Sequence, residues 1–412
     1  MFTLAFRKLA RLAAAAVASL LTLPALAQAP TEIVVWHAYR GNEKTAFEKV
    51  VANYNQAMAG KGVKVTTLAV PFDAFNDKIT AAVPRGKGPD VFIAGQDRLG
   101  GWVEAGNTIE PIDFFLEKSD RGRFIPSTME AMTYQKTTFG LPMNFKVIAM
   151  IYNKKLLPNP PKTSGELVAT AKKLTDANAG RFGLAYWYSN FYYHAALMNG
   201  FGGKVFDAQR NPVLNNPENI KSLEFLMKWF SQDGILPAEP GQALITSLFN
   251  EGKTAMIFDG PWVLGEIAKG VDYGVTTLPT LDEAGGKPMK PWITVEGAFV
   301  AAPSKNKEKA FEFVKYITDT PAGLIMALEG RQTPANLAVY DDAKVKADPV
   351  LSAFRRQVDA AVPMPNLPEM SMFWSHATTA MNILTKKSAT PKAAMDEAQA
   401  KLAKDVQGLR KK

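Results

Sequence analysis

The chain has 412 residues, 47% hydrophobic and 21% charged, a composition typical of a packed protein with two or three domains. It has no cysteine, which excludes disulfides, thiolate metal sites, a cysteine nucleophile and a lipid-modified amino-terminal cysteine. Its three histidines lack metal-ligand spacing and its net charge of +9 is dispersed, so we expect no metal, no cofactor and no nucleic-acid partner.

Residues 1–27 have the pattern of an export signal. Three basic residues precede an apolar run over 12–23, and Pro24 with Ala25-Leu26-Ala27 supplies the helix-breaking end and the cleavage pattern. A helix of 12 residues rises about 18 Å, too short for a hydrocarbon core of about 30 Å. We expect cleavage after Ala27 and a soluble periplasmic chain. The signal holds no acidic residue, so the net charge falls from +9 to +6.

The next segment predicts alternating strands and helices. Strand patterns at 33–36, 63–70 and 91–94 are separated by stretches with helical spacing, among them Phe47, Val50, Val51 and Tyr54. A βαβαβ order implies a parallel sheet with helices on both faces and right-handed crossovers.

A second unit begins after about residue 145. Thr163 is a predicted cap for a helix that runs to Leu174, and strands are predicted at 254–258, 273–278 and 297–302. Two further helices are expected: one at 307–318, and a last helix that Thr390 caps.

Aromatic residues give the strongest functional signal. Six of the eight residues over 186–193 are aromatic, and Trp262, Trp292 and Trp374 lie beside proline or polar residues. Such rings can stack on the apolar faces of a sugar while polar groups bind its hydroxyls. For any single ring, core packing is the simpler interpretation.

Several motifs resemble the maltose-binding protein family, the periplasmic sugar receptors of ABC importers. The match runs in one register from about Ile33 to the carboxyl terminus, and it is carried by Gly88-Pro89-Asp90, Gln96–Gly101, Ile151–Lys154, Leu156–Thr163, Phe249–Met256, Gly260-Pro261-Trp262, Met364-Pro365-Asn366 and Met370–Trp374.

The resemblance implies a two-lobed α/β periplasmic binding fold. Each lobe would be a mostly parallel sheet flanked by helices, with the ligand cleft at the hinge. The expected limits are 28–144 plus 297–343 for the amino-terminal lobe and 145–296 plus 344–412 for the carboxyl-terminal lobe. The implied partners are an oligosaccharide or other small sugar and a membrane permease, and the implied state is a monomer without catalytic residues.

The family's ligand contacts can be carried over residue by residue. Asp97 and Arg98 should bind sugar hydroxyls from the amino-terminal lobe, with Asp77 a further acidic candidate. Tyr192, Trp262 and Trp374 should stack on sugar rings from the other lobe. Further candidates are Tyr39, Arg40, Lys146, Asn190 and Glu296.

This chain departs from the maltose receptor at several of these positions. Ala94 replaces a tryptophan, Lys146 and Asn190 replace glutamates, Ser375 a tyrosine and Thr378 an arginine, and Tyr39-Arg40 stands where that receptor has an Asp-Lys pair. These exchanges alter the hydrogen bonds that discriminate between sugars. We therefore expect a sugar receptor, and two alternatives remain open: a receptor of the same fold for an acidic sugar or a non-sugar solute, and a secreted carbohydrate-active enzyme.

Overall fold

The computed structural model describes residues 30–411 of the chain. The predicted export signal lies outside these residues. Within the described part, no helix is both long enough and apolar enough to cross a membrane.

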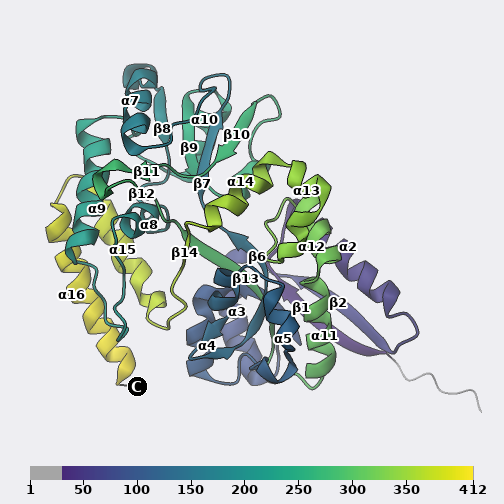
Figure 1. Ribbon diagram of the computed structural model, residues 1–412. Helices are drawn as coiled ribbons and strands as arrows, with labels where there is room; N and C mark the ends of the chain where they lie inside the picture. Colours follow the sequence, from purple (N-terminus) through teal and green to yellow (C-terminus); the bar gives the residue numbers. More distant parts are fainter. Residues whose placement is uncertain (1–29, 412) are drawn as a thin grey trace, which may run out of the picture.

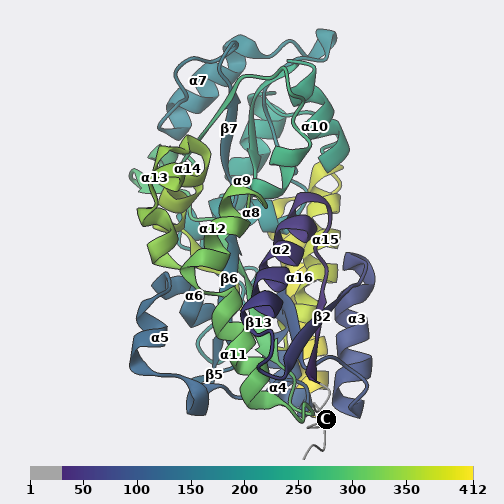
Figure 2. The ribbon, with the colours of Figure 1, turned by 90° about the vertical axis from the view of Figure 1, so that its right-hand side faces the viewer.

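The structure has two lobes, each built on its own sheet, and Figures 1 and 2 show them one above the other. The first lobe contains a six-stranded sheet with β1 (Thr31–His37), β2 (Val63–Ala69), β3 (Val91–Gly95), β6 (Gly140–Lys146), β13 (Trp292–Val300) and β14 (Val362–Pro363). The second lobe contains a four-stranded sheet with β7 (Ala149–Asn153), β8 (Phe182–Ala185), β9 (Thr254–Asp259) and β10 (Tyr273–Thr276). The two-lobed α/β prediction is confirmed.

Helices cover both faces of the first sheet, as the alternation of strands and helices predicted. The helix α2 (Gly41–Ala57) packs with Ile33 and Val35, whereas α3 (Phe72–Ala82) packs with Trp36, from the opposite face of β1. The other helices of this lobe are α4 (Leu99–Ala105), α5 (Lys118–Gly122), α6 (Pro126–Ala131), α11 (Lys307–Ile317) and α12 (Thr320–Leu328).

The predicted parallel pairing is confirmed in one half of the first sheet. β1 lies between β2 and β3 and is parallel to both. β13 then runs antiparallel to β3 and to β6, and pairs in parallel with the short β14. In the smaller sheet the prediction of mostly parallel strands is wrong, because β7 is antiparallel to both β9 and β10, and only β8 and β9 are parallel.

The helices of the second lobe surround its sheet and an aromatic core. They are α7 (Ser164–Leu174), α8 (Phe191–Gly200), α9 (Pro217–Met227), α10 (Gln242–Asn250), α15 (Met370–Thr385) and α16 (Pro391–Arg410). The predicted caps of α7 and α16 are confirmed: the Thr163 hydroxyl accepts the Glu166 N–H at 3.2 Å, and the Thr390 hydroxyl accepts the Ala393 N–H at 3.3 Å.

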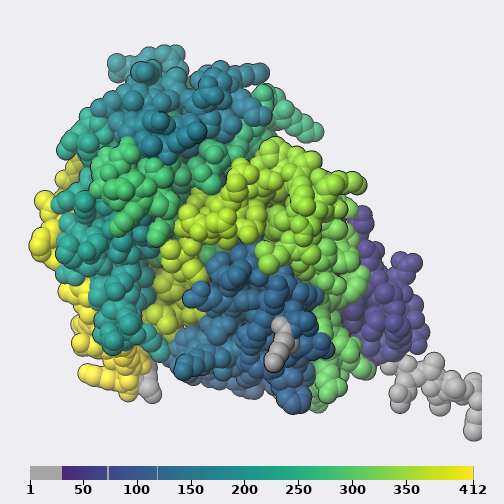
Figure 3. All heavy atoms as spheres, in the orientation of Figure 1, coloured from purple at the N-terminus to yellow at the C-terminus, as the bar shows by residue number. Residues whose placement is uncertain are grey.

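The two lobes join where the chain passes repeatedly between the sheets. β6 ends at Lys146 in the first sheet and β7 begins at Ala149 in the second. A second connection carries α13 (Ala343–Ala347) and α14 (Pro349–Val358), which lie between the lobes in Figure 1 and form the yellow-green band of Figure 3. Two short hairpins, β4 (Thr133–Tyr134) with β5 (Thr137–Thr138) and β11 (Thr280–Leu281) with β12 (Lys287–Pro288), complete the strands.

β13 begins five residues earlier than its predicted start at Gly297. Its first residues pair with β14 and β6, contacts that are distant in sequence. This extension places Trp292, Thr294 and Glu296 on one face of the strand at the junction of the lobes, because side chains alternate along a strand.

Candidate functional site

A polar cluster lies where β6 and β13 pair. Lys146 is opposite Thr294, and Asn144 is opposite Glu296. The Lys146 ammonium is 3.0 Å from Glu296 Oε1, and Asn144 Nδ2 donates to the Tyr39 hydroxyl at 3.2 Å. The Tyr39 hydroxyl in turn donates to Glu296 Oε2 at 3.3 Å. The structure thus brings Tyr39, Lys146 and Glu296 together, three residues that were predicted to bind a ligand; ligand contact by them stays a prediction.

The first turn of α2 adds a second carboxylate to this cluster. Glu43 Oε1 lies 3.9 Å from the Lys146 ammonium and accepts a hydrogen bond from Gln332 Nε2 at 2.8 Å. Arg40 immediately precedes α2 and is exposed, and its side chain does not cap the helix. Glu43 and Gln332 were not predicted. Glu43 could have been suspected from its place one helical turn after Arg40, whereas nothing in the sequence pointed to Gln332.

In the polar cluster, each charged group stabilises the charged form of its opposite neighbour. Burial raises the pKa of Glu43, and the positive charge of Lys146 opposes that rise. Burial lowers the pKa of Lys146, but Glu296 and Glu43 together outweigh it, so the net shift is upward. Lys146 is therefore an ammonium at neutral pH, held between two carboxylates.

An aromatic cluster adjoins the polar one. The ring centroids of Tyr192 lie 6.1 Å from Trp262 and 6.5 Å from Trp292, and Trp292 is 5.9 Å from Trp374. Trp292 is only 2% exposed and is a packing residue, whereas Tyr192, Trp262 and Trp374 are partly exposed. The three rings predicted to stack on a sugar therefore share one cluster and retain accessible surface.

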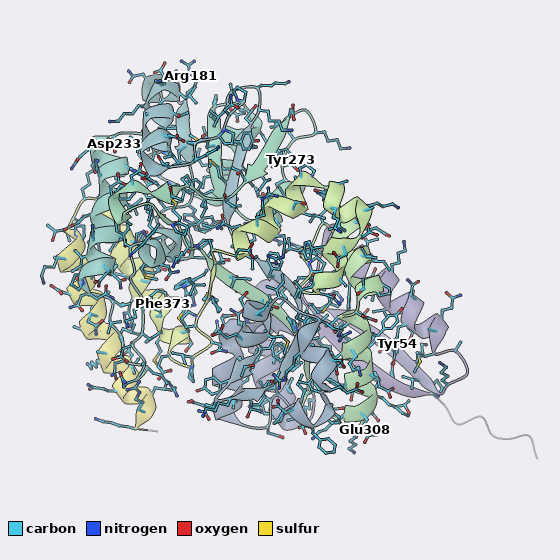
Figure 4. The ribbon with its side chains drawn as sticks, viewed as in Figure 1. Tyr54, Arg181, Asp233, Tyr273, Glu308 and Phe373 are labelled. Carbon is cyan, nitrogen blue, oxygen red and sulfur yellow. The ribbon has the colours of Figure 1, made fainter. Side chains whose placement is uncertain are left out.

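The aromatic and polar clusters meet at Tyr192. Its hydroxyl is 2.9 Å from the Thr294 hydroxyl and donates to the Lys146 carbonyl at 3.4 Å. Helix α15 contributes Trp374 and its neighbour Phe373. Figure 4 shows where this helix lies in the second lobe: Phe373 is far from Arg181 and Asp233, which mark the outer end of the lobe.

Trp262 lies directly over the backbone of Gly260. A Cβ atom at Gly260 would be 2.2 Å from two carbons of the indole ring, so any side chain there would displace the ring. Pro261 then begins the short 3₁₀ helix η6 (Pro261–Gly265). The Gly-Pro-Trp motif is explained by this packing; the sequence singled out Gly260 as part of the motif but did not predict that it lies under the Trp262 ring.

Asp97 and Arg98 lie on the short helix η2 (Gln96–Arg98), directly after β3. The Arg98 Nε is 3.5 Å from Asp97 Oδ2. Burial raises the pKa of Asp97, and the neighbouring guanidinium opposes that rise. Gly95, which precedes η2, pairs with Glu296 across the sheet, so the Asp-Arg pair begins beside the polar cluster.

Gln96 fixes η2 to the junction of the lobes. It is fully buried, and its Oε1 accepts the Val295 N–H at 2.7 Å, while its Nε2 donates to the Met364 carbonyl at 3.4 Å. This side chain therefore ties the Asp97-Arg98 pair to β13 and to the segment that follows β14.

The two remaining predicted residues are Asn190 and Asp77. The Asn190 side chain accepts the Tyr192 N–H at 2.9 Å and caps α8, which gives it a structural role. Asp77 is exposed on α3, and within residues 30–411 it makes no hydrogen bond or ion pair with another predicted site residue. Ligand contact by these two residues stays a prediction.

Comparison with known proteins gives a consistent result. Residues 40–323 match the model of the bacterial extracellular solute-binding protein family. The chain is 32% identical to a maltotriose-binding protein of Pyrococcus abyssi, over 92% of this chain and 83% of the relative. It is 30% identical to a galactooligosaccharide-binding protein of Bacillus subtilis, over 89% of this chain and 88% of the relative.

A solved structure shares the whole architecture. A cyclo/maltodextrin-binding protein complexed with maltotetraose superposes with a TM-score of 0.83 at 30% sequence identity, covering 91% of this chain and 97% of the other.

Proposed function

Because the chain belongs to the bacterial extracellular solute-binding proteins, we propose that it binds a maltooligosaccharide-like sugar between its lobes and delivers it to the membrane permease of an ABC importer. The observation that carries this proposal is the meeting of partly exposed aromatic rings with a charged hydrogen-bonding cluster where the lobes join. Rings stack on the apolar faces of sugars, and charged groups bind hydroxyls. Hinge closure would enclose the ligand.

The pairing of Lys146 supports a neutral sugar over an acidic one. Its ammonium already faces Glu296 at 3.0 Å and Glu43 at 3.9 Å. An incoming carboxylate would meet both of these acids, and like charges repel at such distances. The positive charge of Arg40 also acts on Glu43 and Lys146, so two cations face two acids and the cluster has no excess positive charge for an acidic ligand. In the proposed site Lys146 donates to a hydroxyl group instead.

The proposal is tested by calorimetry with a panel of sugars. The panel holds maltose, maltotriose, maltotetraose, a galactooligosaccharide and a uronate-containing oligosaccharide. Binding to one of the neutral sugars, with a raised melting temperature, is expected, and Trp262→Ala should abolish it while the protein stays folded. No response to any sugar would refute the proposal.

We propose further that the chain releases its sugar unaltered. Its relatives are solute-binding proteins, which supports this reading. Mass spectrometry after prolonged incubation with maltotetraose should return only the intact sugar, whereas shorter products would favour a carbohydrate-active enzyme.

Export with cleavage after Ala27 and location in the periplasm are also part of the proposal, because the family is extracellular. Mass spectrometry of the periplasmic protein would give the mature amino terminus. A monomer is proposed, which light scattering would test.

The lobe limits proposed are 28–144 plus 297–343 and 145–296 plus 344–412. The change of sheet between Lys146 and Ala149 supports a first crossing about two residues after the proposed limit. The later limits differ more from the sheets, because β13 from Trp292 and β14 belong to the sheet of the first lobe. Hydrogen exchange with and without sugar would locate the hinge, where protection should change most.

A further inference from the structure

A buried carboxylate lies behind the aromatic cluster of the second lobe. Asp259 is the last residue of β9, opposite Ala149 at the start of β7, and it is fully buried. None of the proposed sugar contacts includes it.

Three donors from three different segments converge on this carboxylate. The Gly260 N–H donates to Oδ1 at 2.8 Å, and the Tyr193 hydroxyl approaches the same oxygen at 3.2 Å. Gln242, the first residue of α10, donates from Nε2 to Oδ2 at 2.7 Å. The Tyr193 hydroxyl is also within 3.0 Å of Gln242 Oε1, which closes the network.

The network joins the two segments that present sugar-stacking rings. Gly260 lies under the Trp262 ring, and Tyr193 directly follows Tyr192 on α8. The backbone N–H of one segment and the side-chain hydroxyl of the other therefore share one acceptor atom, Asp259 Oδ1. The Trp262 and Tyr192 rings are held with their centroids 6.1 Å apart in front of it.

The environment favours a strong acceptor at this position. Burial raises the pKa of Asp259 to about 6, and the hydrogen bonds from Gln242, Gly260 and Tyr193 limit the rise. Asp259 is thus ionised at pH 7, and hydrogen bonds to a charged acceptor are stronger than those to a neutral one.

We propose that Asp259 is a positioning residue that fixes the spacing of Tyr192 and Trp262 for stacking on a sugar. The inference rests on the proposed sugar-binding function. Removal of the carboxylate leaves the buried Gly260 N–H without its acceptor. The Tyr193 hydroxyl keeps only Gln242 Oε1 at 3.0 Å, and the Gln242 amide keeps only the Thr246 hydroxyl at 3.4 Å, so the link between the two segments is lost. The Gly260 turn and the start of α8 then relax, and the two rings lose their common support.

Three variants separate positioning from general destabilisation. Asp259→Ala removes the acceptor. Asp259→Asn keeps the shape, because its Oδ1 can accept from Gly260, and its Nδ2 can donate to Gln242 Oε1 once that amide rotates. Asn219→Ala is the matched control: Asn219 is buried in the same lobe, accepts the Lys204 N–H at 3.0 Å and donates to the Leu214 carbonyl at 3.1 Å.

Maltotriose affinity is measured by calorimetry, with melting curves for each variant. We expect Asp259→Ala to lose at least tenfold in affinity, Asp259→Asn to stay within about threefold, and Asn219→Ala to bind as the wild type does despite a lower melting temperature. Wild-type affinity in Asp259→Ala would overturn the proposal, as would an equal loss in Asn219→Ala or no rescue by Asp259→Asn.

A readout without ligand separates this inference from the sugar-binding function. The near-ultraviolet circular dichroism of Trp262 is obtained as the difference between the wild type and Trp262→Phe. The same difference taken in the Asp259→Ala background should shrink by at least half, and in the Asn219→Ala background it should persist. An unchanged Trp262 band in Asp259→Ala refutes positioning whether or not a sugar binds.

Discussion

Replacing Gly260 with alanine should weaken sugar binding strongly while leaving the fold intact. The added Cβ would lie 2.2 Å from the Trp262 Cη2 and Cζ3 atoms, where an ordinary contact begins at 3.4 Å, so the ring must retreat by about 1 Å. Gly260 has φ −102° and ψ −179°, which alanine adopts without strain, so the effect arises from the ring and not from the backbone.

The size of the effect follows from the role of a central aromatic residue. Losing a tryptophan that anchors a ligand costs about 2 kcal/mol or more, which is about 30-fold in affinity. Gly265→Ala is the matched control, because Gly265 ends the same 3₁₀ helix and a Cβ there would meet nothing within 4 Å. Calorimetry with maltotriose compares the two variants with the wild type. Binding by Gly260→Ala within threefold of the wild type would show that the position of the Trp262 ring is irrelevant to the ligand.

Three further predictions concern stability. Arg210→Ala should lower the free energy of unfolding by about 2 kcal/mol in urea titration, because it removes the bidentate partner, 2.8 Å away, of the fully buried Glu369 carboxylate and leaves it only Arg410 at 3.3 Å; a loss below 0.5 kcal/mol would contradict this. The folded pKa of Asp259, about 6, lies above the ordinary aspartate value of 3.8. The folded state therefore binds the proton more tightly, and the wild type should lose about 1 kcal/mol of stability relative to Asp259→Asn as the pH rises from 5 to 7. Equal pH dependence in the two proteins would disprove the shift. Gly183→Ala should lower the melting temperature through a loss of about 2 kcal/mol, since its Cβ would lie 2.3 Å from the Ala171 Cα in α7; an unchanged melting curve would show that α7 can move aside.

The sequence predicted best those elements whose determinants are local. The caps at Thr163 and Thr390 are confirmed because a cap depends only on its own helical turn. The start of β13 at Trp292 was missed because those residues become a strand by pairing with β14 and β6, whose partner residues are far away in the chain. The antiparallel direction of β7 in the smaller sheet was not predicted for the same reason, because it depends on how the chain enters the second lobe after Lys146.

The candidate site shows the same difference between features with local determinants and features that depend on residues far apart in the chain. Asp97, Arg98 and the three rings proposed to stack on a sugar were predicted through the resemblance to a known family, and the structure brings the rings into one cluster. Gln332 is 289 residues from Glu43, to which it donates, and no local pattern could connect them. Asn190 illustrates a different difficulty, a residue type that suits two roles. Asparagine is both a good ligand contact and a preferred helix cap, so residue type alone could not reveal that Asn190 caps α8.

The placement of β13 explains how one strand can support both kinds of proposed sugar contact. It belongs to the first sheet through β3 and β6, yet Trp292 at its start packs against Tyr192 and Trp374 of the second lobe. Two and four residues later the same face carries Thr294, which meets the Tyr192 hydroxyl, and Glu296, which pairs with Lys146. Alternate residues of a strand are spaced by about 7 Å, on the scale of one sugar ring, so the strand itself separates Trp292, which supports the rings proposed to stack, from the hydroxyl-binding groups. A change in the register of β13 would therefore disturb both sets of contacts at once, whereas a change in Trp262 or in Asp97 would disturb only one.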